Sequence, residues 1–302
     1  ASNHTRTRSR KSPIVANLRM IHKRPSRKIS CSACRGPIIA PCGAIGRSTR
    51  EDQAAASASP RLDCVRGPDA GRNHLTVGGI KRWVDGALGS HGAWLLAPYD
   101  DLPTSTGLNI VTADELRAAA LLAAEHRLQL CSHAIGDRAN RVTLDVYESV
   151  LTGLSDGDDR RWRVEHAQHL HPDDIPRFAR LGVVASMQPV HCTSDGPWVV
   201  PRLGERRARE GAYMWRDLLD SGALLASGTD VPVEPVDPIA TFHAAVTRKM
   251  ADGTPFHPGQ AMTRDEALGS MTLDAARAAF EEDLKGSLDV GKLADLTVLS
   301  AD

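Results

Sequence analysis

The chain has 302 residues, of which 41% are hydrophobic and 25% charged, and its 37 Lys and Arg residues equal its 37 Asp and Glu residues in number. This composition excludes a wholly disordered or fibrous chain, and the length is enough to bury the core of one large domain or two ordinary ones. No run of about 18 apolar residues occurs, so we expect no transmembrane helix.

The charge is unevenly distributed along the sequence. Residues 1–50 contain twelve Lys and Arg and no Asp or Glu, which leaves 25 basic against 37 acidic residues from residue 51 onward. Residues 1–72 are rich in Arg, Ser and Pro and show neither helical nor strand periodicity. We therefore predict that 1–72 is a basic, low-complexity and disordered segment. A nucleic-acid-binding tail or an organelle transit peptide is the alternative for this segment.

The six cysteines are too few for a disulfide scaffold. Cys31-x-x-Cys34 has the spacing of half a zinc knuckle, but no second pair follows at a suitable distance. We expect unpaired thiols in a reducing compartment, which favours a cytoplasmic location.

Strands and helices alternate from residue 73 onward. Thr112 and Glu115 form a predicted capping box at the start of a helix that runs to about His126, and Thr263 with Glu266 predicts a second one. Repeated βα units with short connections predict parallel strands covered by helices. The predicted strands lie within 75–86, 127–137, 161–168, 183–189 and 224–230, further helices within 142–151, 172–180 and 215–222, and short β segments within 286–299.

Polar residues mark the predicted strands at regular intervals. Lys81 lies in the first of these strands, and His133, His166, Gln188 and Asp230 each end a later one. His166 follows His133 by 33 positions and precedes Asp230 by 64, so the marked residues recur once per βα unit. In a closed βα barrel the carboxyl ends of the strands surround one shared mouth, where such enzymes place their catalytic groups. We therefore predict that these side chains converge.

Two imidazoles and a carboxylate are suitable ligands for zinc or a similar divalent ion. A bound ion lowers the pKa of its water toward about 7, and a carboxylate such as Asp230 can then accept the proton. Lys81 would be a ligand only after carboxylation by CO₂, because a free ammonium repels a cation. A single strand-end histidine is more often a hydrogen-bonded structural residue, but the ordered set favours a metal site.

Five blocks of the sequence resemble consecutive blocks of the amidohydrolase superfamily, specifically its YtcJ-like branch (amidohydrolase family 3), which is related to N-substituted formamide deformylases. The resemblance covers about residues 75–302. The blocks are GGIKRWVDGALGSHGAWLLAPYDD, SHAIGDRAN, RVEHAQHLHPDDIPRFARLGVVASMQPVH, LLASGTDVPVEPVDP and KGSLDVGKLADLTVL.

This resemblance implies an α/β fold, a TIM-type (βα)8 barrel over 73–284, followed by the start of a small β-sandwich over 285–302. It implies a hydrolase that acts on a non-peptide carbon–nitrogen bond of a small amide or formamide, with one or two divalent ions, zinc above all. By position, Lys81 would be the carboxylated bridging lysine, His133 and His166 would be metal ligands, and Asp230 would be a ligand and the general base.

The sequence also departs from the family pattern. The superfamily opens its barrel with a His-x-His pair, whereas the histidines before Lys81 are isolated and lie outside apolar runs: His4, His22 and His74. His169-Leu-His171 matches the His-x-His motif, but it follows the sixth-strand histidine and is interpreted as a loop. We therefore expect a partial barrel with little activity of this chain alone. The alternative function is a truncated, catalytically incompetent family member that binds at most one metal.

Three further residues are expected near the mouth as substrate-binding groups: Asp85, Gln188 and His191. For Asp85, capping of a loop is an equally good interpretation. Glu165 is expected to point away from the mouth because it alternates with His166 along the strand. No membrane partner is expected, nucleic acid is suggested only by the basic segment, and a homo-oligomer is left open.

Overall fold

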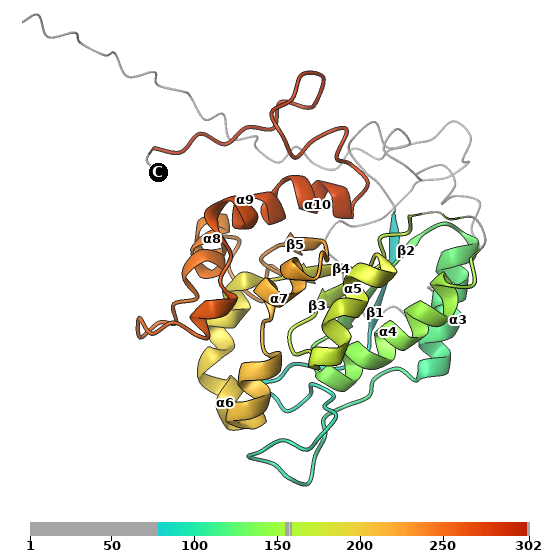
Figure 1. Ribbon diagram of the computed structural model, residues 1–302, viewed down its shortest axis with the longest axis vertical. Helices are drawn as coiled ribbons and strands as arrows, with labels where there is room; N and C mark the ends of the chain where they lie inside the picture. Colours follow the sequence, from blue (N-terminus) through green and yellow to red (C-terminus); the bar gives the residue numbers. More distant parts are fainter. Residues whose placement is uncertain (1–77, 155–156, 158, 301–302) are drawn as a thin grey trace, which may run out of the picture. The chain divides into compact units, whose positions relative to one another are not determined.

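The computed structural model describes residues 78–154, 157 and 159–300 (Figure 1). The predicted basic segment 1–72, the Cys31–Cys34 pair and the three early histidines lie outside these residues. The described residues all belong to one compact unit. In chain order the elements are β1 (Gly79–Trp83), α3 (Ala113–Glu125), β2 (Gln129–Ala134), α4 (Asp137–Leu151), β3 (Arg163–His166), the 3₁₀ turn η1 (Pro172–Asp174), α5 (Ile175–Leu181), β4 (Val184–Met187), α6 (Pro189–Gly211), α7 (Trp215–Asp220), β5 (Leu225–Ser227), α8 (Pro238–Thr247), the 3₁₀ turn η2 (Pro258–Gln260), α9 (Arg264–Met271) and α10 (Leu273–Ala278).

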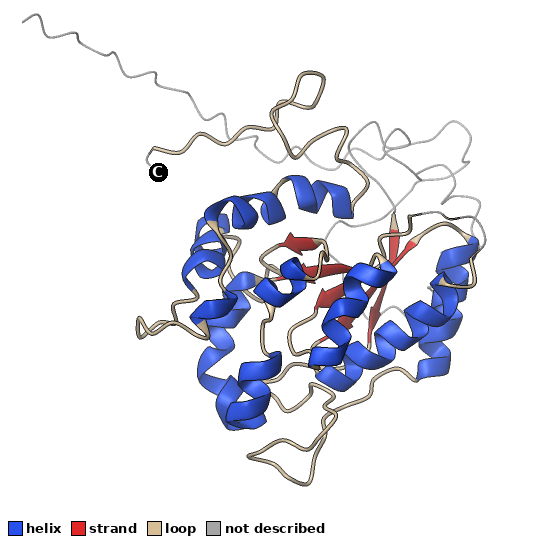
Figure 2. Ribbon diagram, in the orientation of Figure 1, coloured by secondary structure: helices blue, strands red, loops and turns tan. Residues whose placement is uncertain are grey.

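The strands form one parallel sheet in the order β1-β2-β3-β4-β5, so each strand pairs with the next one along the chain. Figure 2 shows helices packed around these strands. Helices lie between successive strands in the sequence, as the alternating pattern predicted. A parallel sheet in which neighbours follow chain order, each joined by a helical crossover, is the arrangement of a βα barrel. The predicted fold class, a partial TIM-type barrel, is thereby confirmed.

The two faces of the sheet differ in polarity. The face toward α4 is buried, and the Tyr147 hydroxyl from α4 reaches it, 3.0 Å from Leu130 O and 2.8 Å from Ser132 Oγ. These bonds satisfy the hydroxyl, so the ring is buried without a polar penalty. The opposite face carries polar side chains from neighbouring strands, which face the interior of the partial barrel: Lys81, Cys131, His133, Arg163 and Glu165.

Local signals in the sequence set several helix ends. Both predicted capping boxes are present, with Glu115 N donating to Thr112 Oγ1 at 3.2 Å and Glu266 N to Thr263 Oγ1 at 3.2 Å. Gly182 ends α5 in the left-handed conformation at φ 62°, where a side chain would be strained.

Helix α6 was not predicted. It contains two internal prolines, Pro197 and Pro201, and it is broken at Gly204, whose φ is 74°. Each of these features argues against a continuous helix. The sequence pattern therefore did not predict α6. Pro189 at its start fits the first turn, where the missing N–H leaves no hydrogen bond unmade.

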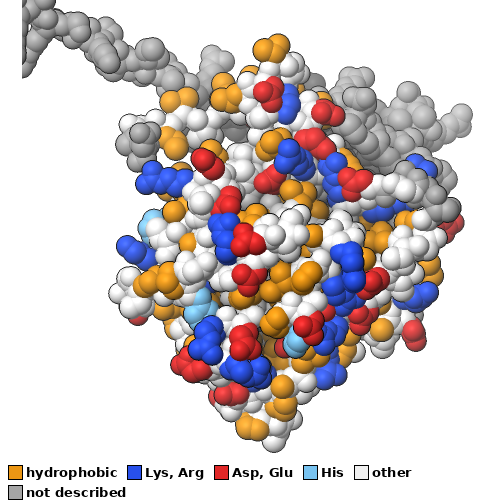
Figure 3. Space-filling view, in the orientation of Figure 1, with side chains coloured by type: hydrophobic (Ala, Val, Ile, Leu, Met, Phe, Trp, Pro, Cys, Tyr) orange, Lys and Arg blue, Asp and Glu red, His pale blue; other side chains and the backbone are white. Residues whose placement is uncertain are grey.

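Charged residues tie α4 to α5 on the helical side, where Figure 3 shows acidic and basic side chains interspersed. Arg177 of α5 bonds Asp145 at 2.7 Å and Glu148 at 2.8 Å, both on α4, and also reaches the buried Asp174 at 2.9 Å. The exposed pairs contribute little, about 0–1 kcal/mol each, whereas the buried carboxylate needs its cation.

The expected short β segments at the end of the chain are not formed. The described residues 285–300 contain turns and irregular backbone without a strand, and Leu288, Val290 and Val298 are almost fully exposed. A strand needs a neighbouring strand for its backbone hydrogen bonds, and the described residues supply none at this segment. Of the six cysteines, Cys131 and Cys192 are described, and both are buried free thiols. No helix among the described residues is long and apolar enough to cross a membrane.

Candidate metal centre

Histidine rings and one carboxylate gather at the carboxyl ends of the strands. The ring centroids of His133 and His166 are 4.4 Å apart with an edge-on orientation, and those of His166 and His191 are 5.9 Å apart and nearly parallel. One nitrogen each of His166 and His191 and one carboxylate oxygen of Asp230 all lie within 4.8 Å of one another. The structure thus brings together three residues predicted as ligands, and it adds His191, which was predicted only as a substrate contact.

The backbone turns at His166 and thereby aims its ring. His166 has φ 78° and Ala167 φ 43°, in the left-handed region that residues with a side chain rarely adopt. Asp230 shares this property, with φ 56°. Strained residues of this kind persist where the surrounding structure holds them, and they cluster at functional sites.

Glu165 lies on the same face of the sheet as His133, because the two residues are opposite each other in the parallel register. The expectation that Glu165 points away from the site is wrong. Strand alternation was applied between Glu165 and His166, but the turn at His166 breaks that alternation. The carboxylate bonds Arg163 at 2.9 Å, and the neighbouring charges of Arg163 and Lys81 overcome the effect of burial and lower the pKa of Glu165.

Gln188 contacts a predicted ligand directly. Its Oε1 lies 2.6 Å from Nδ1 of His166, and its Nε2 donates to Ser186 O at 3.3 Å. With Nδ1 of His166 donating to Gln188, Nε2 carries the free lone pair, so this contact selects the nitrogen that can bind a metal. Both polar atoms of the Gln188 side chain have partners within the protein, so its position favours orientation of His166 over contact with substrate.

Asp85 is 1% exposed and is surrounded by backbone donors. Its oxygens accept from Trp94 N and Gly136 N at 2.8 Å and from Ile135 N at 3.0 Å. Burial raises the pKa of Asp85 to about 7, against the effect of these three donors. The geometry favours the loop-capping interpretation, in which Asp85 fixes the loops beside His133, whose Nε2 is 3.5 Å away.

His133 and His166 favour the neutral form. Burial, assisted by the charges of His166 and Lys81, lowers the pKa of His133 to about 2. Burial also lowers the pKa of His166. Neutral imidazole is the form that binds metals. Burial also lowers the pKa of Lys81, with Glu165 opposing, which increases the fraction of neutral amine, the form that reacts with CO₂.

Unpartnered nitrogens test whether a metal fits these residues. Nε2 of His133 and Nε2 of His191 are buried and have no hydrogen-bond partner within the described part of the chain. A buried polar atom without a partner costs about 1–3 kcal/mol, and native proteins leave few such atoms unexplained. An ion held together with His166 and Asp230 would satisfy Nε2 of His191, so this donor set fits a divalent metal.

The His169-x-His171 motif does not take part. His169 lies in a loop, donates from its backbone to Ile135 O at 2.9 Å, and packs against Tyr213. His171 caps η1, with Asp173 N donating to its Nδ1 at 3.3 Å. The interpretation of this motif as loop is confirmed.

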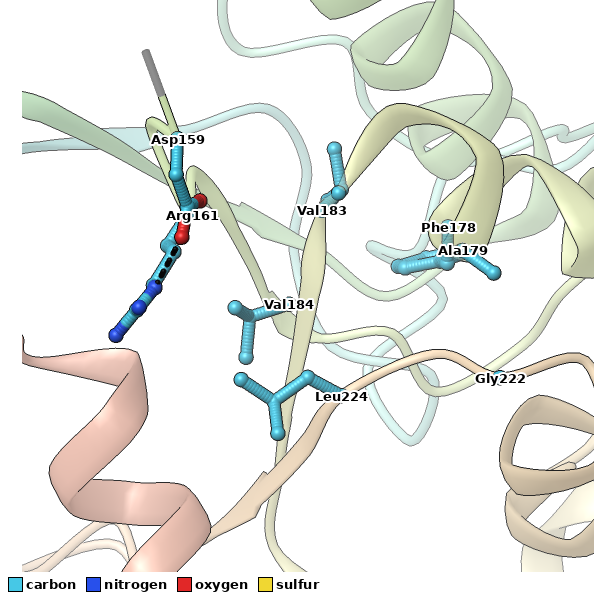
Figure 4. Close-up of a pocket in the computed structure, with 9 residues that line it drawn as sticks. Asp159, Arg161, Phe178, Ala179, Val183, Val184, Gly222 and Leu224 are labelled. Carbon is cyan, nitrogen blue, oxygen red and sulfur yellow. Dashed lines mark hydrogen bonds and ion pairs between the residues drawn. The ribbon is translucent and has the colours of Figure 1, made fainter. Parts of the chain in front are cut away.

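A cavity of about 190 Å³ lies at the other end of the sheet (Figure 4). Val183 and Val184, which line it, stand at the start of β4, whereas Gln188 follows the end of that strand. The cavity is therefore separate from the histidines. Its lining combines apolar side chains with one ion pair, between Asp159 and Arg161, and consists of Asp159, Arg161, Phe178, Ala179, Gly182, Val183, Val184, Gly222 and Leu224.

Known proteins have sequences similar to that of this chain. A model of the amidohydrolase family matches residues 19–302, so the match begins well before residue 75, where the resemblance was first apparent. The chain is 41% identical to the protein LONG AFTER FAR-RED 3 of Arabidopsis thaliana over 227 residues and 34% identical to the putative amidohydrolase YtcJ of Bacillus subtilis over 248 residues. These matches cover 75% and 80% of this chain, and 39% and 44% of the relatives. An N-substituted formamide deformylase of Arthrobacter pascens is 29% identical over 76% of this chain and 41% of its own length.

Solved structures give the same result for the fold. An uncharacterised metal-dependent hydrolase from Pyrococcus horikoshii is 36% identical with a TM-score of 0.68, and the match covers 76% of this chain and 46% of that one. One from Pyrococcus furiosus is 36% identical with a TM-score of 0.65, covering 75% and 45%. The chain spans less than half the length of the relatives it matches. From the family match and the shared fold, we conclude that the chain belongs to the amidohydrolase family.

Proposed function

We propose that this protein is a metal-dependent hydrolase that cleaves a non-peptide carbon–nitrogen bond of a small amide or formamide. The observation that carries the proposal is the grouping of donor atoms of His166, His191 and Asp230 within 4.8 Å of one another at the carboxyl ends of parallel strands, with the ring of His133 against that of His166. A βα barrel places its catalytic groups at this end.

The protein's residues would divide the work as follows. His166 and Asp230 would hold the ion, with Gln188 fixing the orientation of His166; His133 and a carboxylated Lys81 would be further ligands. Zinc suits these donors, and when bound it would polarise the substrate carbonyl and lower the pKa of water toward about 7.

Asp230 would carry out the proton transfers of the reaction. Its side chain is exposed and makes no hydrogen bond or ion pair with another described residue. It would take a proton from the attacking water as the new carbon–oxygen bond forms. It would then give that proton to the nitrogen as the carbon–nitrogen bond breaks, so that the products are an amine and a carboxylic acid.

The names of the relatives support the substrate class. YtcJ is named a putative amidohydrolase and the Arthrobacter pascens protein an N-substituted formamide deformylase. Both relatives contain long regions beyond the matched part. Their activity is therefore only a proposal for this chain, and the assay must use this chain itself.

A second candidate is metal binding without turnover. It is favoured by one observation: within the described residues, the ligand atoms grouped within 4.8 Å of one another would serve a single ion. Under this alternative the chain retains one metal and hydrolyses nothing.

The two candidates are separated by one assay on the purified chain. Zinc content is measured, and amine release from an N-substituted formamide is followed before and after removal of the metal by a chelator. Hydrolysis that disappears with the metal and returns with added zinc supports the hydrolase. Bound zinc without turnover supports the second candidate, and a chain that retains no divalent metal refutes both.

A further inference from the structure

His191 is built into the site more firmly than a substrate contact requires. It lies in the first turn of α6 and is 8% exposed, and its Nε2 is buried without a hydrogen-bond partner in the described structure. Its backbone is held at both ends, because His191 N donates to Gln188 O at 3.0 Å and its carbonyl accepts from the buried Tyr213 hydroxyl at 3.1 Å. These two bonds fix the position of His191, and its Nε2 is free to bind a ligand.

The ring of His191 faces the two residues with which it could share an ion. It stacks on His166 at 16°, and its donor atom belongs to the same group as donors from His166 and Asp230, all within 4.8 Å of one another. Ligand atoms about 2.1 Å from a tetrahedral zinc lie roughly 3.4 Å apart. The donors of this group lie within 4.8 Å of one another, so they would approach one another further on binding the ion. His133 is absent from the group, although its ring touches that of His166.

The turn Gln188-Pro-Val-His191 thus contributes two residues to the site. Gln188 leaves Nε2 of His166 free for a metal through its contact with Nδ1, and His191 adds an imidazole three residues further on. Two imidazoles and a carboxylate with a fourth position open are the ligand set of a catalytic zinc site.

We infer that His191 is a direct metal ligand, binding through Nε2, and that His166, His191 and Asp230 hold one ion. This inference rests on the proposed metal dependence but assigns a ligand that the proposed function does not require. A bound ion also explains why a buried imidazole nitrogen is left without a partner.

The test measures zinc affinity by competition with a chromophoric chelator, on the full chain and on four variants, of which His166→Ala removes a ligand of the proposed function. His191→Ala removes the ligand, His191→Cys replaces it with another zinc ligand, and His243→Ala removes an exposed histidine on α8 whose Nδ1 lies 3.4 Å from Thr247 Oγ1 of the same helix. Because loss of an outer partner alone typically weakens metal binding about 10- to 100-fold, loss of a direct ligand should weaken it more than about 100-fold.

We expect wild type and His243→Ala to bind one zinc equally, His191→Ala to lose more than about 100-fold in affinity, and His191→Cys to recover most of it. The thermal midpoint without metal shows that the variants are folded, and the increase in that midpoint with zinc should be absent in His191→Ala. If His191→Ala does not fold, NMR of the wild-type imidazole nitrogens decides, because Nε2 of His191 must shift when zinc is added.

Two other outcomes are distinguishable. Unchanged affinity in His191→Ala, together with lost affinity in His166→Ala, overturns the inference and leaves the proposed function intact. Failure of the wild type to bind zinc overturns both.

Discussion

Nδ1 of His166 and Oε1 of Gln188 are 2.6 Å apart, which joins the last residue of β3 to the residue that follows β4. A carboxamide oxygen can only accept a hydrogen bond, so this contact requires Nδ1 of His166 to carry the proton. The tautomer and the orientation of the ring are therefore set by the residue that follows the neighbouring strand, before any metal binds.

Replacement of Gln188 should weaken metal binding without removing a ligand. For Gln188→Ala we expect a loss of about 10- to 100-fold in zinc affinity, because Nδ1 of His166 loses its acceptor and the ring can rotate. Gln188→Glu keeps an acceptor at the same place and should retain most of the affinity. Equal affinities for Gln188→Ala and wild type, measured by chelator competition, would show that His166 is oriented by other contacts.

The pH dependence of stability should include a contribution from His169. Burial lowers the pKa of His169 to about 3, from an ordinary value of 6.5. Its Nε2 lies 3.3 Å from the Gln168 amide nitrogen, from which the neutral ring can accept. The unfolded chain therefore binds a proton that the folded chain does not, and stability present above pH 6.5 is lost as the pH falls toward 3.

Urea unfolding of the metal-free chain at several pH values measures this loss. For His169 alone the slope is at most about 1.4 kcal/mol per pH unit below the unfolded pKa. His169→Phe cannot titrate, so its stability should fall less steeply over the same range. Parallel curves for the two proteins would show that His169 is protonated in the folded state.

Asp85 is predicted to act on stability and to leave the affinity for metal largely unchanged. Asp85→Ala leaves the amides of Trp94, Ile135 and Gly136 without their acceptor, and we expect a loss of about 3 kcal/mol or more in the free energy of unfolding. Asp85→Asn retains one acceptor oxygen and should lose less. A fully stable Asp85→Ala variant with weakened substrate binding would instead support the substrate contact expected from the sequence.

Asp230 is predicted to separate catalysis from binding. Asp230→Asn keeps the shape of the side chain and an oxygen donor, but it cannot accept the proton of the attacking water. We expect zinc to remain bound with reduced affinity, while amine release from a formamide substrate falls at least about 100-fold. The ratio of rates at equal zinc occupancy is the measurement, and an unchanged ratio would exclude Asp230 as the general base.

The sequence was sufficient for features that depend on local pattern. The capping boxes at Thr112 and Thr263, the end of α5 at Gly182, and the strand-end positions of His133 and His166 follow from short-range signals. Each needs only a few neighbouring residues to be specified, which is why it could be predicted.

Features that depend on contacts distant in sequence could not be predicted in this way. The place of Glu165 is set by the register of β3 against β2 and by the turn at His166. The inferred role of His191 as a metal ligand depends on its place in the first turn of α6. That helix was not predicted, because Pro197 and Pro201 lie within it. The i, i+3 spacing of Gln188 and His191 was the one available signal, since on a helix it brings two side chains to the same side.

The position of a bound ion tests the proposed centre most directly. Crystals of the chain grown with zinc would be measured at the zinc absorption edge, and an anomalous difference map would locate the ion. The centre described above predicts one strong peak about 2.0–2.2 Å from Nε2 of His166, Nε2 of His191 and a carboxylate oxygen of Asp230. A map with no peak at the carboxyl ends of β3, β4 and β5, or with zinc only elsewhere on the protein, would contradict it.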